Sequence, residues 1–375
     1  MKSFMRKIKA KLFNFHNPIP SDIAAFKEDL HKISELEIDD YKRSFYQYKI
    51  REKYGDCKFI LIRKVTYYII GHLFYFYVIV KSKRKIDLEK KDVVYYKISN
   101  KDILPGKFKN AYQFSFGQNY YWDNNTKYIF NKMKIVSSND WSYLFETLFS
   151  LANYSYIINK YQPFKIVTTY ESSCASSILT LLCSKNNIEH IDFMHGEKLY
   201  SHLNTLAHFN KIYVWDEYYV KLYNRLLFKY DDISVFNPWL NKKEEGLFNY
   251  ERDMCFYLNY ESKESLEILA DVINKLALKG LKVIIRPHPS QIEEILKKNI
   301  IKIDYIENPK DISIFDSINK TDKIVSRFST VLFQAYSMNK KIVIDNVSDI
   351  EQYNKLKEVG YIMIEKEHEL LSDIL

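Results

Sequence analysis

From residue 160 onward, short apolar runs alternate with amphipathic stretches in a regular order. The apolar runs predict strands at 164–169, 190–194, 211–215, 233–236, 254–258, 283–285, 323–325 and 341–344. Between them, apolar residues recur three or four positions apart, as on one face of a helix, and predict helices at 172–184, 217–227, 263–278, 291–298, 311–318, 331–338 and 350–359. This alternation is typical of α/β folds built on parallel sheets.

A charged segment that contains a glycine, 241–246, interrupts this alternation. Such a segment indicates a domain boundary, and 375 residues are enough for two domains. We therefore expect an N-terminal domain over 1–240, with a helical N-terminal extension, and a C-terminal domain over 241–375. Because each would contain its own series of strands and helices, both are predicted to be Rossmann-like.

The first 160 residues follow a less regular pattern. They predict a helix-rich, irregular region up to about residue 90, a strand at 92–98, and an amphipathic helix at 141–161 that ends before Gln162-Pro163. The longest apolar run of the chain, 67–80, is shorter than the roughly 20 residues that a membrane-spanning helix needs. We expect it to form a buried helix or a pair of strands, with a membrane-dipping segment as the alternative.

The net charge of +9 is spread unevenly along the chain. Residues 1–15 interleave basic and apolar side chains, and on a helix they would present a basic face and an apolar face of Phe4, Ile8, Leu12 and Phe15. Such a helix suits the surface of an anionic membrane, although an ordinary packed terminal helix has the same pattern. No sizeable apolar stretch follows it, so a secretory signal is not indicated. We expect a cytoplasmic protein, peripheral on the inner face of the cytoplasmic membrane.

Several classes of function are not favoured by the sequence. The basic residues are mixed with acidic ones and match no nucleic-acid-binding motif, so no nucleic-acid partner is expected. The chain has no G-x-G-x-x-G motif and no Walker loop, and no cofactor is expected. The four cysteines lack paired spacing and predict reduced thiols. Because His202 and His208 have no acidic partner at ligand spacing, no metal site is predicted.

Two motifs follow predicted strands in the C-terminal domain. Arg286-Pro287-His288-Pro289-Ser290 ends the strand at 283–285, and Ser326-Arg327-Phe328-Ser329-Thr330 precedes the helix at 331–338. Ligands of open α/β sheets bind at such carboxyl ends of strands. The first motif offers a cation and an imidazole, and the second offers hydroxyls and the N–H groups of a helix start, which suit a phosphate. Together they indicate a nucleotide mono- or diphosphate donor.

A third motif, His195-Gly196, ends the strand at 190–194 in the N-terminal domain. In this order the three motifs resemble those of GT-B enzymes of bacterial surface-polymer synthesis. One similar branch is the CDP-glycerol glycerophosphotransferases, which carry His-Gly, Arg-x-His-Pro and Ser-Ser motifs. The other is the capsule and lipopolysaccharide transferases that use CMP-sialic acid or CMP-Kdo. The resemblance covers about residues 160–365 and implies an α/β GT-B fold, with two Rossmann-like domains facing a central cleft.

The chain departs from both branches at several positions. Arg327 stands where the glycerophosphotransferase motif commonly has Asp, and Ser329-Thr330 replaces Ser-Ser. Glu197 follows His195-Gly196 where that branch tends to have Thr-Pro. The acidic motif of sialyltransferases is not found. The donor therefore stays open between a CMP-sugar and a CDP-polyol.

The motif residues would divide the chemistry of a metal-independent transfer among them. His195 would be the general base for the acceptor hydroxyl, because imidazoles ionise near neutral pH. Glu197 would be the rival base, or the group that orients His195. His288 would donate a hydrogen bond to the leaving phosphate, on a backbone held by Pro287 and Pro289.

The other candidate residues would bind the two substrates. Arg286 would reinforce His288 or anchor its loop through a carboxylate, and Pro289 would belong to the same donor site. Ser326, Ser329 and Thr330 would hydrogen-bond the donor phosphate, or cap the helix that follows.

Residues at two further strand ends complete the candidate set. Glu171 and Ser172 would line the acceptor site, with helix capping as the alternative. Two segments near the start of the C-terminal domain, 237–238 and 260–262, would reach the nucleotide.

We therefore expect a transferase that moves sialic acid or Kdo from a CMP-activated donor to a glycan or a lipid-linked glycan. The near alternative is polyol-phosphate transfer from CDP-glycerol or CDP-ribitol. A non-catalytic GT-B-like scaffold subunit of polysaccharide assembly is a second alternative. A third is an epimerase-like enzyme that turns over a nucleotide sugar without an acceptor.

Overall fold

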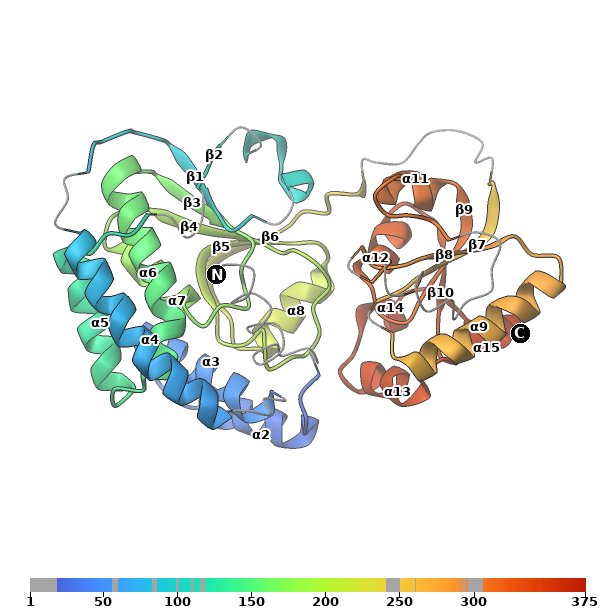
Figure 1. Cartoon of the computed structure of the whole chain (residues 1–375), viewed down its shortest axis with the longest axis horizontal. Coiled ribbons are helices and arrows are strands. Elements are labelled where there is room, and N and C mark those ends of the chain that lie inside the picture. Colours follow the sequence, from blue (N-terminus) through green and yellow to red (C-terminus); the bar gives the residue numbers. More distant parts are fainter. Residues whose placement is uncertain are drawn as a thin grey trace. The chain divides into compact units, whose positions relative to one another are not determined.

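The computed structural model describes residues 19–375, except for 56–59, 83–85, 99–100, 109–110, 115–118, 241–249, 260, 290, 293–294 and 296–305. The chain divides between Phe236 and Asn237 into two compact units (Figure 1). The segment 241–246, where the sequence places the domain boundary, lies outside the described residues. Each unit has its own sheet and its own hydrophobic core.

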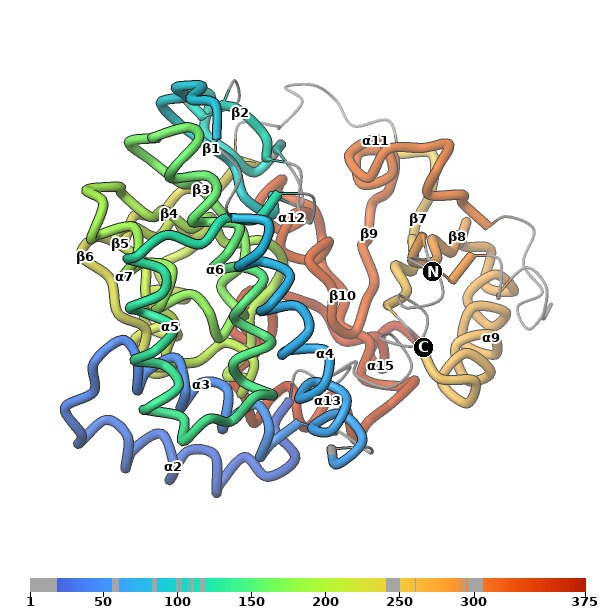
Figure 2. The backbone as a smooth tube through the Cα atoms, turned by 60° about the vertical axis from the view of Figure 1, so that its left-hand side comes forward, coloured from blue at the N-terminus to red at the C-terminus, as the bar shows by residue number. Residues whose placement is uncertain are grey.

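The first unit is built on a six-stranded sheet in its described part, with every neighbouring pair parallel (Figure 2). Its strand order is β2-β1-β3-β4-β5-β6. The strands are β1 (Val93–Tyr96), β2 (Tyr112–Gln113), β3 (Lys165–Thr168), β4 (Glu189–Phe193), β5 (His208–Val214) and β6 (Lys229–Val235). Because all run in one direction, the loops that follow them gather at one edge of the sheet.

Helices of the first unit pack beside this sheet. They are α2 (Ile23–Ser34), α3 (Asp40–Tyr54), α4 (Ile60–Lys81), α5 (Asn124–Val136), α6 (Trp141–Tyr161), α7 (Ser176–Ser184) and α8 (Glu217–Arg225), with the short 3₁₀ turns η1 (Lys101–Ile103) and η2 (Gly106–Phe108). The α6 helix is the centre of the packing, because it contacts α4, α5 and α7. Figure 1 shows α4 and α6 side by side.

Local capping explains where α6 begins and ends. The Asp140 carboxylate accepts hydrogen bonds from the backbone N–H groups of Ser142 and Tyr143, at 3.1 and 3.4 Å. At the other end Gln162 adopts a left-handed conformation with φ of 45°, and Pro163 follows it. The helix therefore begins after Asp140 and ends before Gln162, and the predicted bounds 141–161 are confirmed.

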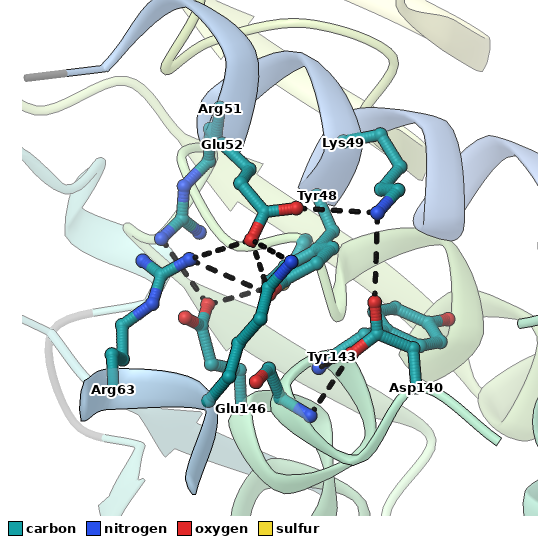
Figure 3. Close-up of polar contacts among 11 residues, drawn as sticks. Tyr48, Lys49, Arg51, Glu52, Arg63, Asp140, Tyr143 and Glu146 are labelled. Carbon is teal, nitrogen blue, oxygen red and sulfur yellow. Dashed lines mark hydrogen bonds and ion pairs between the residues drawn. The ribbon is translucent and has the colours of Figure 1, made fainter. Parts of the chain in front are cut away.

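A polar network ties α3, α4 and α6 together (Figure 3). Arg63 of α4 is buried and pairs with Glu52 of α3 at 3.3 Å. Arg51 of α3 pairs with Glu146 of α6 at 3.2 Å. Because these charges lie between helices and compensate one another, they define which face of α4 points inward.

The second unit contains a five-stranded parallel sheet among its described residues, in the order β11-β10-β9-β7-β8. The strands are β7 (Arg252–Tyr257), β8 (Val283–Arg286), β9 (Thr321–Ser326), β10 (Lys341–Ile344) and β11 (Glu369–Leu370). The helices are α9 (Lys263–Leu278), α11 (Ile314–Asn319), α12 (Thr330–Ser337), α13 (Ile350–Glu358), α14 (Ile362–Glu365) and α15 (Leu371–Ile374). The expected α/β class, with a parallel sheet in each of two units, is thus confirmed.

Some predicted elements differ from the structure. The helix predicted at 172–184 begins only at Ser176, because 171–175 form turns after β3. The run 67–80 is part of one helix, α4, as the helix alternative predicted. One face of this helix is exposed, so the prediction that the helix is buried is wrong for that face. The predicted N-terminal helix 1–15 and most of the predicted helix 291–298 lie outside the described residues.

The helices of the described part differ widely in length and hydropathy. None of them is both long enough and apolar enough to cross a bilayer.

Candidate functional site

The carboxyl ends of β3 and β4 bring Glu171 and His195 together in the first unit. These strands are direct neighbours in the sheet, so the loops that follow them are adjacent, although the two residues are 24 positions apart in the chain. His195 is 35% exposed at its side chain, whereas Glu171 is fully buried. The pair therefore joins a buried carboxylate to an imidazole that reaches the surface.

Three hydrogen bonds converge on the Glu171 carboxylate. The His195 ring atom Nδ1 lies 3.0 Å from Oε2. The Lys198 ammonium lies 2.6 Å from Oε1, and the backbone N–H of His195 donates to the same oxygen at 3.4 Å. Because an ionised carboxylate can only accept, Nδ1 carries the proton and Nε2 of neutral His195 is left as an acceptor. This tautomer is the one that a general base requires.

The charges around Glu171 keep it ionised. Burial opposes ionisation, but the charges and hydrogen bonds of His195 and Lys198 outweigh it and hold the pKa of Glu171 well below its usual range. Lys198 is itself buried and compensates the carboxylate. When His195 takes up a proton, the Glu171 carboxylate can therefore stabilise the imidazolium and still keep its ion pair with Lys198.

The loop after β4 is shaped by Gly196. Its φ is 72°, in the left-handed region that favours glycine. The turn lets the Lys198 ammonium donate back to the His195 carbonyl at 2.8 Å. Lys198 thus fixes the backbone of His195 as well as the carboxylate that orients its ring.

Glu197 points to a different partner. Its carboxyl group shares a hydrogen bond with the Tyr219 hydroxyl of α8. Burial raises the pKa of Glu197 to about 8, so the carboxyl group carries a proton at neutral pH. The sequence offered Glu197 as the group that orients His195. In the structure Glu171 contacts the His195 ring and orients it.

Two more residues lie beside Glu171. Ser172 follows it in the turn before α7 and is partly exposed. Asp192, which the sequence interpretation missed, is a buried residue of β4 whose Oδ1 accepts from the backbone N–H of Tyr170 at 3.0 Å. Burial and the charge of Glu171 raise the pKa of Asp192 well above its usual range. An aspartate between Ile191 and Phe193, inside the predicted strand 190–194, was the signal that could have revealed it.

In the second unit the candidate donor residues follow β7, β8 and β9. Strand β7 lies between β8 and β9, and the chain crosses from one side of β7 to the other. The loops after β7 and β9 therefore diverge at a topological switch point, where ligands of α/β sheets bind. The loops after β8 and β9 begin two strand spacings apart, or about 10 Å.

The α12 helix begins at this switch point. Ser329 is its N-cap, and the Ser329 hydroxyl accepts a hydrogen bond from the backbone N–H of Val331 at 3.3 Å. Thr330 is the first residue of the helix, and its first turn contains no acidic residue. Capping, the alternative role for Ser329, is therefore present, and the helix start also offers the positive end of its dipole. Ser326 is buried and donates to the Tyr257 carbonyl at 2.7 Å.

Arg286 anchors the loop rather than pointing to the surface. It is buried, and its guanidinium and that of Arg252 each donate to one oxygen of the buried Glu307 carboxylate. A second nitrogen of Arg286 donates to the Ile312 carbonyl at 2.9 Å. Of the two roles predicted for Arg286, the contacts show the anchoring one.

His288 stands between a buried Pro287 and an exposed Pro289. Its side chain is partly buried, and burial lowers the pKa of His288. Its carbonyl accepts from the backbone N–H of Gln291 at 2.8 Å, which bends the chain back after the motif. A neutral imidazole in this place can donate one N–H to a ligand without adding charge to the site.

An ion pair missed from the sequence links the loops after β7 and β9. Arg327, which follows β9, pairs with Glu261, which follows β7, and also donates to the Ser348 hydroxyl at 3.2 Å. Burial raises the pKa of Glu261, and the Arg327 charge opposes that shift. Asn259 adds a second link by donating to the Phe328 carbonyl at 2.9 Å. Both links hold the start of α12 in place.

The described residues include no metal site, and one surface pocket lies away from the candidate site. Among the described residues, no group of three His, Cys, Asp or Glu side chains could hold a metal ion. One surface pocket of 340 Å³ is lined by Glu189, Asn210, Lys211, Asp231 and Asp232, among others. These residues lie toward the amino ends of β4, β5 and β6, at the edge opposite His195, so the pocket is separate from the candidate site.

No model of a protein family and no curated protein matches this chain. Several solved structures resemble it. A variant of the wall teichoic acid polymerase TagF is similar at a TM-score of 0.39 and 11% identity, over 85% of this chain and 82% of that chain. UDP-N-acetylglucosamine 2-epimerase from Rickettsia bellii is similar at 0.39 and 11%, over 67% and 77%. The UDP-GlcNAc 2-epimerase from Methanocaldococcus jannaschii is similar at 0.38 and 13%, over 82% and 90%. Similarity at these identities concerns the fold alone.

Proposed function

We propose that this protein is a glycosyltransferase that moves a sugar from a CMP-activated donor, CMP-sialic acid or CMP-Kdo, to a hydroxyl of a cell-surface glycan. The observation that carries the proposal is the pairing of His195 with the buried, ionised Glu171 at the carboxyl edge of a parallel sheet. Such a pair suits general-base catalysis at a hydroxyl, because the carboxylate orients the imidazole and stabilises its protonated form.

The first unit would activate the acceptor. Nε2 of His195 takes the proton of the attacking hydroxyl while Nδ1–H stays bonded to Glu171. The imidazolium that forms is stabilised by the Glu171 carboxylate, and Lys198 balances that carboxylate when His195 is neutral. Ser172, which is partly exposed beside them, would contact the acceptor.

The second unit would bind the donor. The N-terminus of α12, with Ser329 and Thr330, offers hydroxyls and helix-dipole charge to the phosphate of CMP. His288, in the loop after β8, donates an N–H to the phosphate oxygen on which charge develops as the bond to the sugar breaks. Arg286 contributes by holding the His288 loop through Glu307.

A CDP-glycerol or CDP-ribitol donor is the second candidate. It is favoured by the order of His195-Gly196 and Arg286-Pro287-His288-Pro289 along the chain, which resembles the glycerophosphotransferase branch. In that reaction the hydroxyl attacks phosphorus and CMP again leaves, so the same base and the same phosphate contacts would serve. The two candidates differ in the group that is transferred and in the atom that is attacked, which is the sugar carbon in one and phosphorus in the other.

The test combines nucleotide binding with turnover. Melting temperatures are measured with CMP, CDP, UDP and GDP, and CMP release is measured from CMP-sialic acid, CMP-Kdo and CDP-glycerol with and without a surface-glycan fraction. We expect CMP to stabilise the wild type and His195→Gln, but not His288→Ala. We expect His195→Gln to lower acceptor-dependent CMP release by about 100-fold or more. His31→Ala, a highly exposed histidine on α2, is the matched control and should behave as wild type.

Other outcomes would redirect or end the proposal. Stabilisation by UDP or GDP alone would refute the CMP-donor assignment. Turnover that does not depend on an acceptor would favour the epimerase-like alternative. If a folded protein responds to none of the nucleotides, the scaffold alternative takes its place.

A further inference from the structure

The α4 helix has an exposed face composed of apolar side chains. These side chains are Leu61, Ile62, Val65, Tyr68, Ile69, Leu73, Phe76, Tyr77 and Val80. They recur three or four positions apart, so they form one stripe along the helix. The stripe runs from Leu61 to Val80 and is about 30 Å long. We call it the α4 stripe.

The opposite face of α4 is packed against the first unit. Arg63 is bound to Glu52 on that side, as Figure 3 shows. Gly71 lets the helices approach closely, since a Cβ atom at this position would lie 3.0 Å from Trp141 and 3.3 Å from Phe145 of α6. Phe74 stacks on Phe149 of α6 with ring centroids 3.8 Å apart. These contacts fix the rotation of α4 and leave the α4 stripe pointing outward.

The charges of this region have one sign. Between residues 58 and 85 the sequence contains seven lysines and arginines and no aspartate or glutamate; the basic residues are Lys58, Arg63, Lys64, Lys81, Lys83, Arg84 and Lys85. Within α4, Arg63 and Lys64 both pair with Glu52 near its start, whereas Lys81 is its last residue and three more basic residues follow in the sequence. An apolar stripe that leads into this basic run matches an anionic, amphipathic surface.

We propose that the α4 stripe inserts into the headgroup region of an anionic lipid bilayer, with α4 lying in the plane of the membrane. The exposed Tyr68, Phe76 and Tyr77 are side chains that favour this interface. A second copy of the chain fits less well, because its own α4 stripe has no acidic residue between 58 and 85 to meet the basic ones. The proposal goes beyond the transferase function and does not depend on it, although a membrane position would suit a lipid-linked acceptor.

The proposal is tested by flotation of the full-length protein with vesicles of phosphatidylcholine, alone or mixed with phosphatidylglycerol. We expect binding to the mixed vesicles and weaker binding to neutral ones. The double variant Leu73→Gln/Phe76→Gln should lower the vesicle partition coefficient by more than about tenfold, because two apolar side chains no longer leave water. The matched control is Ile135→Gln/Leu278→Gln, which removes two exposed apolar side chains from α5 and α9 and should bind as wild type.

Each other outcome contradicts the proposal. Flotation of Leu73→Gln/Phe76→Gln at the wild-type level would place the membrane contact elsewhere, since residues 1–15 are unchanged in this variant. A wild-type protein that ignores both kinds of vesicle would end the proposal. A dimer seen by light scattering, and lost in the same variant, would assign the α4 stripe to a second copy.

Two readouts separate this proposal from the proposed function. The variant should keep the wild-type melting temperature and the nucleotide response, because the substituted side chains point away from the core. If the first variant does not fold, Leu61→Gln/Val65→Gln repeats the test at the other end of the α4 stripe.

Discussion

Removal of the charge on Glu171 tests the candidate base most directly. Glu171→Gln keeps the shape of the side chain but leaves the ammonium of Lys198, which is 8% exposed, without its carboxylate. Breaking one side of a buried ion pair typically lowers the free energy of unfolding by about 3–5 kcal/mol, and we expect about 3 kcal/mol because the amide oxygen still accepts one hydrogen bond. Catalysis should fall at least 100-fold, since the amide no longer selects the Nδ1–H tautomer of His195.

A double-mutant cycle separates charge compensation from packing. We expect Lys198→Met alone to lower the free energy of unfolding by about 2 kcal/mol, and the double variant Glu171→Gln/Lys198→Met to be no worse than Glu171→Gln, because it contains neither buried charge. Urea unfolding followed by tryptophan fluorescence measures this, since Trp122, Trp141 and Trp215 lie in the first unit. Catalysis should stay low in the double variant.

The pH dependence gives an independent check. The lowered pKa of Glu171 stabilises the folded protein above the ordinary carboxyl pKa of 4.5, and this stabilisation is lost as the pH falls below that value. The difference in stability between wild type and Glu171→Gln should therefore shrink below pH 4.5. Strictly additive effects of the two substitutions at neutral pH would refute the compensation of Glu171 by Lys198.

Three further substitutions test other parts of the structure. Glu197→Gln should flatten the pH dependence of the melting temperature between pH 4.5 and about pH 8, because the raised pKa makes wild type lose stability as the pH rises through this window. Gly196→Ala should lower the free energy of unfolding by about 1 kcal/mol in urea, through its φ of 72°. Ser329→Ala should lower it by about 1 kcal/mol through loss of the α12 cap, and should weaken CMP binding measured by calorimetry.

The substitutions of Gly196 and Ser329 each have a control within the chain. Gly106→Ala adds a Cβ in open space at a residue without positive φ and should be nearly neutral, so an equal loss there would contradict the explanation for Gly196. Ser313→Ala removes the N-cap of α11, because the Ser313 hydroxyl accepts from the backbone N–H of Asp316 at 3.1 Å. It should lower stability without changing CMP affinity. If Ser329→Ala binds CMP like wild type, the Ser329 hydroxyl only caps α12. A wild-type melting temperature that does not change between pH 4.5 and about pH 8 would contradict the raised pKa of Glu197.

Elements with strong local signals could be predicted from the sequence. The helix 263–278 agrees with α9 because Ser262 caps it and Gly280, with φ of 87°, follows its end. The run 67–80 was harder, because its apolar residues lie on both faces of α4. Periodicity shows which residues share a face, but it does not show whether another element covers that face.

The pairing of Glu171 with His195 was not predicted, for a different reason. The sequence placed both residues at the carboxyl ends of strands, but their contact depends on β3 and β4 being neighbours in the sheet. The order of strands is set by packing over the whole domain and has no local signal. The same holds for Arg286. Its partner Glu307 lies between the predicted helices 291–298 and 311–318, where no strand or helix was predicted.

The parallel arrangement of β1 and β3 has a consequence for how the first unit folds. The Thr169 hydroxyl, just after β3, donates to the Lys97 carbonyl, just after β1, at 3.0 Å and across 72 residues of chain. Contacts of such long range form slowly, because the intervening loop must close before any of them is gained. During synthesis, β1 has to wait until β3 has left the ribosome before it can pair. The exposed strand edge in that interval would make the nascent chain dependent on protection from aggregation.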